Sequence, residues 1–307
     1  MLRSTLLAAA RSGVVRAAVE AGPFEPLVQR FVAGTTVDAA IAAARTITTD
    51  RLVTVDHLGE DTTDRAQADA LVAAYRSLLR RLGDEGLADR VEVSVKLSAF
   101  GQRLPRDGEK IALDSARQVC EAAAAVGTTV TVDMEDHTTT DATLTTVRDL
   151  RLDFPWVGAV LQSQLRRTEG DCRDLAGPGS RVRLCKGAYD EPESVAYRSA
   201  AEVDLSYVRC LKILMSGRGL PMVATHDPRL VAIARHLAQR YGRSVRDYEL
   251  QMLYGVRPNA QTDLAARGLQ VRVYLPYGTE WFGYFMRRLA ERPANLAFFA
   301  RSLMSRG

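Results

Sequence analysis

Short runs rich in β-branched residues alternate with longer segments of helical period from residue 50 onward, and this alternation constrains the fold more than any other feature. The strand candidates are 52–57, 91–97, 128–134, 157–162, 181–186, 221–225, 248–253 and 269–275. A plausible helix follows each of them, as at 64–82, 110–126 and 203–215. The pattern predicts a parallel sheet made of βα units.

Eight units at a spacing of roughly 25 to 40 residues suit an α/β fold of the (β/α)8 barrel type. An open doubly wound sheet is the alternative, but the first strand is not followed by the GxGxxG pattern that would favour it. We expect residues 1–49 to form a helical segment that packs on the barrel, and residues 50–307 to form the barrel itself.

Composition excludes several classes of protein and partner. The 307 residues are 47% hydrophobic and 25% charged, as in globular proteins. The net charge of +4 comes from 41 basic and 37 acidic residues spread along the chain, which argues against nucleic-acid binding and favours a small-molecule ligand. The 4 cysteines form no CxxC pair and the 4 histidines share no ligand spacing, so we expect no metal site and a reducing, cytoplasmic setting.

The first 22 residues carry arginines at 3, 11 and 16 and no acid before Glu20, which superficially suggests a transit or signal peptide. Arg11 interrupts the apolar stretch, so an amphipathic N-terminal helix is the simpler interpretation. No apolar run approaches the length of about 18 residues needed to cross a bilayer.

In a (β/α)8 barrel the chemistry lies at the carboxyl ends of the strands. The polar residues predicted there are Asp56, His57, Lys96, Asp133, Glu135, Asp136, Gln162, Arg183, Lys186, Thr225, His226, Tyr254, Tyr274 and Tyr277. Lysine is the sharper signal, because the 41 basic residues include only four lysines, at 96, 110, 186 and 212, and two of these end strands. We expect Asp133 to form an ion pair with Lys96 of the neighbouring strand, and Asp136 to cap the following helix.

Two further segments carry cations. In residues 183–189 Arg183 and Lys186 surround a strand end and precede Gly187, where a ligand can approach the backbone, as in an anion or cofactor cradle. In residues 284–291 Tyr284, Arg288 and Glu291 share one helical face. Its adjacent arginines, 287 and 288, have the planar fork that grips a carboxylate, although a solvated Arg/Glu face is an equal alternative.

Seven motifs in this order resemble the proline dehydrogenase family: SVKLSAF, VDMED, VLQSQLRRT, RLCKGAY, VATHD, ELQMLYG and YFMRRLAE. The resemblance implies a (β/α)8 barrel that holds non-covalent FAD at the strand ends and passes a hydride from L-proline to flavin N5. The product would be Δ1-pyrroline-5-carboxylate. Electrons would go on to a quinone, and a separate pyrroline-5-carboxylate dehydrogenase would take the product.

The resemblance also assigns roles to residues of this chain. Asp133 and Arg183 would be catalytic, Asp133 in a polar network and Arg183 as a fixed positive charge near flavin N5. The proline carboxylate and ring would be held by Lys96, Arg287, Arg288, Tyr274, Tyr284 and Leu253. FAD would be contacted by Met134, Gln162, Arg183, Lys186, Gly187, Ala188, Thr225, His226 and Glu291.

The chain is similar to the monofunctional form of the family, with Asp190 where larger relatives place an aromatic residue. A quinone acceptor implies transient contact with a membrane surface, at its inner face for a cytoplasmic protein. Two other interpretations stay open from the residues alone. One is a class I aldolase-type barrel with Lys186 or Lys96 as the Schiff-base nucleophile, and the other is a barrel that binds a small molecule without catalysis.

Overall fold

Eight parallel strands form a closed barrel in the computed structural model, which describes residues 25–290. The strands β1–β8 are Leu52–His57, Val91–Val95, Val130–Val132, Gly158–Gln162, Arg181–Cys185, Leu220–Ala224, Glu249–Leu253 and Val271–Tyr277. Each pairs with its neighbours in sequence, and β8 closes the ring on β1, from Leu52 opposite Arg272 to His57 opposite Tyr277. The predicted (β/α)8 barrel is confirmed, and the open sheet is wrong.

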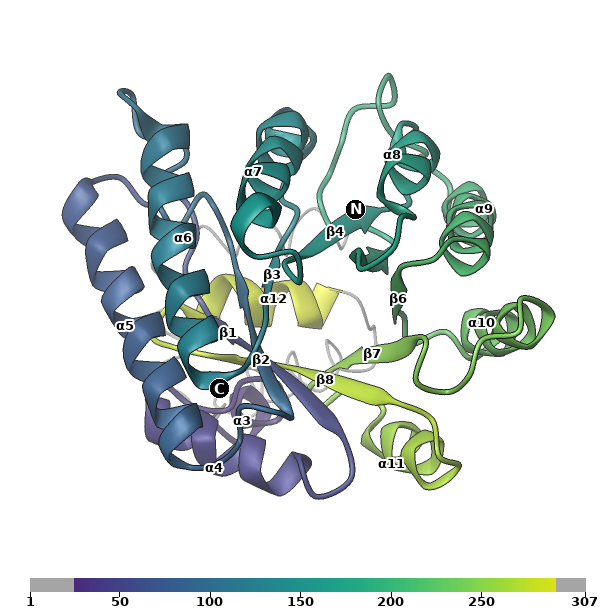
Figure 1. Ribbon diagram of the computed structural model, residues 1–307, viewed down its shortest axis with the longest axis horizontal. Coiled ribbons are helices and arrows are strands. Elements are labelled where there is room, and N and C mark those ends of the chain that lie inside the picture. The colour runs from purple at the N-terminus through teal and green to yellow at the C-terminus, as the bar shows by residue number, and fades with distance from the viewer. Residues whose placement is uncertain (1–24, 291–307) are drawn as a thin grey trace, which may run out of the picture.

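Helices surround the strands (Figure 1). The bounds are α3 Glu25–Gln29, α4 Val37–Ile47, α5 Arg65–Asp84, α6 Gly108–Val126, η1 His137–Thr139, α7 Thr140–Asp153, α8 Thr168–Leu175, α9 Ala200–Ser216, α10 Pro228–Arg240, α11 Pro258–Ala266 and α12 Trp281–Ala290. Their starts follow from capping chemistry. Asp64 accepts from the backbone N–H of Gln67 ahead of α5, and Ser199 with Glu202 forms a capping box on α9.

Strand ends are the main difference from the sequence-based bounds. Four of the predicted strands run past the observed ones at the carboxyl end: β2 stops at Val95, β3 at Val132, β5 at Cys185 and β6 at Ala224. Lys96, Asp133 and Lys186 therefore lie just beyond the regular ladder, where the backbone leaves the sheet. At the start of the next connection Asp136 caps η1, as predicted, by accepting from the backbone N–H of Thr138.

Helix α12 differs from the other helices in position. In Figure 1 it lies within the outline of the helix ring rather than outside it. Its buried face packs on α3 and on the segments that follow β1 and β7, in a cluster composed of Leu27, Phe31, Val32, Leu58, Val256, Phe282, Tyr284, Phe285 and Met286. Because those segments leave the carboxyl ends of their strands, α12 covers that end of the barrel. Helix α4 packs instead on β1 and β8.

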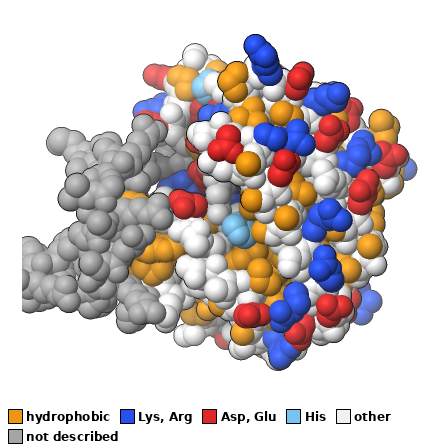
Figure 2. Space-filling view, turned by 90° about the vertical axis from the view of Figure 1, so that its left-hand side faces the viewer, with side chains coloured by type: hydrophobic (Ala, Val, Ile, Leu, Met, Phe, Trp, Pro, Cys, Tyr) orange, Lys and Arg blue, Asp and Glu red, His pale blue; other side chains and the backbone are white. Residues whose placement is uncertain are grey.

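The N-terminal segment is described from residue 25, so the expected amphipathic helix in the first 22 residues lies outside the described residues. None of the helices between residues 25 and 290 is long and apolar enough to cross a membrane. On the face that carries α5 and α6, basic and acidic side chains are interleaved (Figure 2). The ion pairs made by α5 include Arg81 with Asp38 of α4 and Arg65 with Asp69.

Candidate active site

Three charged side chains from neighbouring strands meet at the carboxyl end of the barrel. The Lys96 ammonium donates to both carboxylate oxygens of Asp56, at 2.8 and 2.7 Å, and lies 3.7 Å from Asp133 Oδ2. Asp56 is 1% exposed. The predicted pair of Lys96 with Asp133 is thus present only at the longer distance, because Asp56, one strand away on the other side, takes both short hydrogen bonds.

Asp133 is the centre of a second set of contacts. Its Oδ1 accepts from Arg183 Nη1 at 2.6 Å and from the Ser94 hydroxyl at 2.7 Å, and its Oδ2 accepts from the Tyr274 hydroxyl at 2.6 Å. Arg183 also lies over the Tyr274 ring, 5.2 Å from its centroid. A carboxylate buried this deeply keeps its charge only when it is paired and hydrogen-bonded, and here every oxygen has partners.

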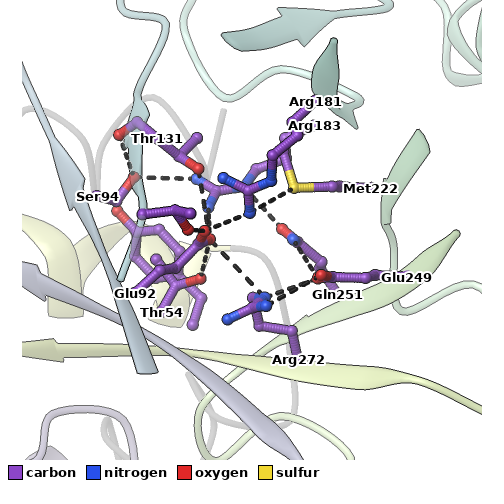
Figure 3. A network of polar contacts seen from close by, with 12 residues as sticks. Thr54, Glu92, Ser94, Thr131, Arg181, Arg183, Met222, Glu249, Gln251 and Arg272 are labelled. Carbon is purple, nitrogen blue, oxygen red and sulfur yellow. Dashed lines mark hydrogen bonds and ion pairs between the residues drawn. The ribbon is translucent and has the colours of Figure 1, made fainter. Parts of the chain in front are cut away.

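Below this level the barrel interior is filled by an ion network, seen in Figure 3. Glu92 pairs with Arg181 and lies 3.6 Å from Arg183 and 3.8 Å from Arg272. Burial opposes the charge of Glu92, but the three guanidinium groups outweigh it and hold the pKa of Glu92 far below its usual range. Arg272 in turn donates to Glu249 at 2.6 and 3.0 Å.

A cavity of about 220 Å³ opens beside this network at the amino end of the barrel, where its lining includes Arg90, Thr128, Arg181 and Arg272. Its charged groups Arg181 and Arg272 already pair with Glu92 and Glu249. In barrels of this type the amino end serves stability and the carboxyl end serves catalysis. We therefore place the candidate active site around Lys96 and Asp133, not at this cavity.

The protonation state of Lys96 bears on the Schiff-base interpretation. Burial alone would lower the pKa of Lys96, but the carboxylates of Asp56 and Asp133 outweigh it and raise that pKa above its ordinary value. A Schiff-base lysine needs the opposite shift, because only the neutral amine attacks a carbonyl. Lys186, the other candidate, points away to Asp204 on α9, 2.5 Å from its ammonium.

The arginines of α12 face different partners. Arg287 donates to Glu60, in the connection after β1, at 2.7 Å. Arg288 is 9% exposed and its guanidinium lies over the Tyr284 ring, 5.0 Å from the centroid. The equal alternative of a solvated Arg/Glu face is therefore wrong for Arg288, which is buried. Glu291 lies outside the described residues.

The remaining apolar and aromatic candidates line the same end of the barrel. Leu253 is the last residue of β7, is half-buried and packs against the cluster under α12. Tyr274 is half-buried on β8, and burial first, then the charge of Asp133, raises the pKa of its hydroxyl well above the usual value. Tyr284 is buried on α12. The predicted apolar wall and the predicted cations thus belong to adjoining elements.

The predicted cofactor residues of β3 to β6 form an arc at the strand ends. Gln162 donates from its amide to the backbone carbonyl of Glu135 at 2.6 Å, and Met134 is buried in the core beside it. The Thr225 hydroxyl accepts from the backbone N–H of Asp227, and His226 Nε2 accepts from the backbone N–H of Leu253 at 2.8 Å. Lys186 is the exception, since its ammonium turns outward.

Gly187 has a backbone that only glycine adopts easily. Its φ is +108°, and a Cβ placed there would overlap the side chain of Gln164. Ala188, the next residue, is exposed. The chain thus passes close to Gln164 at Gly187 and reaches the surface at Ala188, which suits the approach of a ligand from solvent.

Sequence reasoning did not assign roles to several residues that complete the site. Asp56 was among the strand-end candidates but had no assigned partner, and Glu60, Ser94 and Gln251 were not singled out. Ser94 and Gln251 lie within strands and are almost fully buried. A polar residue in the middle of a buried strand was the available signal, because such a group needs a buried partner.

Within residues 25–290 no group of three or more His, Cys, Asp or Glu is placed to hold a metal.

Comparison with known proteins gives one consistent result. The family model described as proline dehydrogenase matches residues 40–301. The chain is 38% identical over 281 residues to "Proline dehydrogenase" of Deinococcus radiodurans, covering 91% of this chain and 90% of that protein. It is 34% identical over 279 residues to "Proline dehydrogenase 1" of Bacillus subtilis (strain 168), covering 91% of each.

Solved structures give the same answer for the fold. The structure of proline utilization A from Bdellovibrio bacteriovorus, inactivated by N-propargylglycine, superposes with a TM-score of 0.81 at 25% sequence identity. The match covers 91% of this chain and 34% of that one, so this chain corresponds to about a third of the larger protein.

Proposed function

This chain belongs to the proline dehydrogenase family, and we propose that it oxidises L-proline to Δ1-pyrroline-5-carboxylate with FAD as its cofactor. Proline oxidation as a step of proline catabolism is what the family membership itself gives. The single observation that supports the fuller proposal is the meeting of Lys96, Asp133 and Arg183 under a helix that carries Arg288.

The substrate explains the composition of the site. Proline has one carboxylate and one apolar ring, so a complementary pocket needs cations at one end and a hydrophobic wall at the other. We assign the carboxylate to Arg287 and Arg288, with Lys96 assisting, and the ring to the wall of Tyr274, Tyr284 and Leu253. Arg287 would exchange Glu60 for the substrate, since both partners are carboxylates.

The residues present fit a flavin. Arg183 is 5% exposed and is held between strands, so it offers a fixed positive charge that needs no reorganisation. Gly187, whose positive φ only glycine adopts easily, and the exposed Ala188 after it suit close approach of a cofactor to the backbone. The flavin would be held by Met134, Gln162, Arg183, Lys186, Gly187, Ala188, Thr225, His226 and Glu291. Bound FAD would supply, at its N5 atom, the acceptor for the hydride that proline gives up.

We propose that Asp133 and Lys96 supply fixed charges and hydrogen bonds in a part of the site from which water is excluded. Asp133 fixes both Arg183 and the Tyr274 hydroxyl, so one carboxylate orients a cation and part of the ring wall together. Lys96 stays protonated because Asp56 holds it, and it therefore acts by charge and hydrogen bonding, not as a base. Helix α12 covers this end of the barrel and limits access of water.

We propose further that the electrons pass to a quinone and that the protein works in the cytoplasm, touching the inner face of the membrane transiently. A separate pyrroline-5-carboxylate dehydrogenase would receive the product. These proposals rest on family membership alone.

The test is an absorbance spectrum of the purified protein, followed by anaerobic addition of L-proline while the flavin band near roughly 450 nm is recorded. We expect a yellow protein whose band bleaches with L-proline but not with L-alanine or D-proline. A protein that stays colourless and takes up no added FAD would overturn the cofactor assignment. A protein that retains FAD but is not bleached by L-proline would overturn the substrate assignment.

A further inference from the structure

Arg183 is held from a side that the proposed mechanism does not use. Its Nη1 faces Asp133 and Ser94, while its Nε donates to the Gln251 side-chain oxygen at 2.7 Å. Gln251 comes from β7, is 3% exposed and meets the arginine of β5, two strands away in the ring, inside the barrel (Figure 3). The guanidinium is thus fixed by contacts from both directions around the ring, from β2 and the residue after β3 on one side of β5 and from β7 on the other.

The orientation of the Gln251 amide is also determined. Its nitrogen donates to Glu249 Oε2 at 3.2 Å, and an ionised carboxylate only accepts hydrogen bonds. Glu249 is kept ionised by Arg272: burial opposes its charge, but the paired guanidinium lowers the pKa of Glu249. The amide oxygen must therefore turn toward Arg183, which can only donate.

We propose that Gln251 is a positioning residue for Arg183, acting through this amide and backed by Glu249 and Arg272; the inference rests on the proposed flavin chemistry. Arg183 donates to Gln251 and Gln251 donates to Glu249, which also accepts from Arg272, so the hydrogen bonds from the two arginines converge on the Glu249 carboxylate. The function of this set of contacts is to fix the direction of the Arg183 guanidinium without adding negative charge beside it.

The neutrality of Gln251 is the informative point. A carboxylate at this position would make an equally short hydrogen bond to Arg183 but would cancel much of its charge, because Asp133 already supplies one anion at 2.6 Å and Glu92 another at 3.6 Å. It would also place two anions side by side, next to Glu249. An amide holds the arginine and leaves its positive charge available to an electron-rich ligand.

The experiment measures the midpoint potential of the bound flavin by dye equilibration in the holoenzyme. Removal of the hydrogen bond in Gln251→Met should lower the equilibrium constant for flavin reduction about tenfold, as expected for loss of one charge-assisted contact, which is about 30 mV for a two-electron couple. Gln251→Glu should lower it further, through the added charge. Gln102→Met is the matched control, since Gln102 is also buried, at 7% exposed, and its amide has no hydrogen-bond partner among the described residues.

A double-mutant cycle shows whether the effect passes through Arg183. In an Arg183→Met background, Gln251→Met should cause no further change in potential. The proposal is wrong if Gln251→Met and Gln251→Glu both keep the parent potential, or if Gln251→Met shifts it equally with and without Arg183. If Gln251→Met does not fold, Gln251→Ala, which also removes the hydrogen bond without adding charge, takes its place in the cycle. A parent protein that binds no flavin would instead refute the proposed function, and this inference with it.

Discussion

Lys96 is bound to Asp56 by two hydrogen bonds shorter than 3 Å and stands about an ångström farther from Asp133. Asp56 thereby leaves Asp133 available to Arg183 and to the Tyr274 hydroxyl. A lysine shared equally between both acids would compete with Arg183 for Asp133. The division of acids between two cations therefore keeps the Lys96–Asp56 pair apart from the set of contacts that joins Asp133 to Arg183 and Tyr274.

Replacement of Asp56 should disturb both sides together. In Asp56→Asn, Lys96 is drawn toward Asp133, so kcat/KM for proline should fall about tenfold or more, and the free energy of unfolding should fall by about 3 kcal/mol because a buried pair is broken. Steady-state kinetics and urea unfolding measure the two effects.

Asp61→Asn is the control for that variant. Asp61 lies in the connection that follows β1, is largely exposed, and has a positive φ of 52° that asparagine also tolerates. Its ion pair with Arg103, at 3.5 Å, contributes at most about 1 kcal/mol. Equal effects of Asp56→Asn and Asp61→Asn would contradict the role given to Asp56.

Arg288→Lys should weaken binding of the substrate carboxylate. Lysine keeps the charge but loses the planar fork and the stacking on Tyr284, so KM for proline should rise roughly 10- to 100-fold. Binding of pyrrolidine, which has the ring but no carboxylate, should be nearly unchanged. Arg267→Lys, at an exposed arginine after α11, serves as the control. An equal loss of pyrrolidine binding would mean that Arg288 shapes the pocket instead.

Gly187→Ala should reduce retention of FAD. The new Cβ meets the Gln164 side chain in a backbone of positive φ, and strain of about 1–3 kcal/mol at the cradle should weaken flavin binding about tenfold or more. Gly170→Ala is the matched control, because Gly170 lies in α8 and a Cβ added there would meet nothing within 4 Å. The flavin-to-protein ratio after gel filtration distinguishes them, and equal ratios would remove Gly187 from the cradle.

Stability should depend on pH through the interior carboxylates. The pKa of Glu92 is depressed in the folded protein, so its contribution is present above the unfolded pKa of about 4.3 and is lost as pH falls below it. The free energy of unfolding should decrease by up to about 1.4 kcal/mol per pH unit in this range for each such group, and Glu249 adds a second.

Glu92→Gln should therefore flatten the decline of stability between about pH 4 and pH 3, although it lowers stability at pH 7. Glu249→Gln is the alternative if Glu92→Gln does not fold. Urea unfolding at several pH values measures the slope, and an unchanged slope in either folded variant would show that these acids do not carry the effect.

Much of the fold was predictable because its signals are local. A run such as 52–57 has a period and composition that identify a strand without knowledge of its neighbours, and the count of eight then limits the architecture. The placement of Lys96, Asp133 and Arg183 at one end followed from the rule that parallel strands share a carboxyl edge.

Partners inside the barrel were not predictable in the same way. Whether Lys96 binds Asp56 or Asp133 depends on rotamers and on what else competes for each acid, and Arg183 settles it by occupying Asp133. Gln251 is a polar residue in a strand with the pattern of a buried strand, and only the closed barrel shows that it meets Arg183 of β5. Such pairings depend on how the strands pack together in the interior, and the hydrophobic periodicity of each strand does not predict them.

The pairing of β8 with β1 also has a consequence for synthesis on the ribosome. The edge of β1 that finally meets β8 stays open while all the intervening units are translated, and an open edge is a template for pairing with other chains. Arg272, which joins the interior ions to Glu249, arrives with that last strand. Translation halted before residue 271 would leave an incomplete ring in which Glu249 lacks its arginine, and we expect such a chain to be captured by chaperones or degraded.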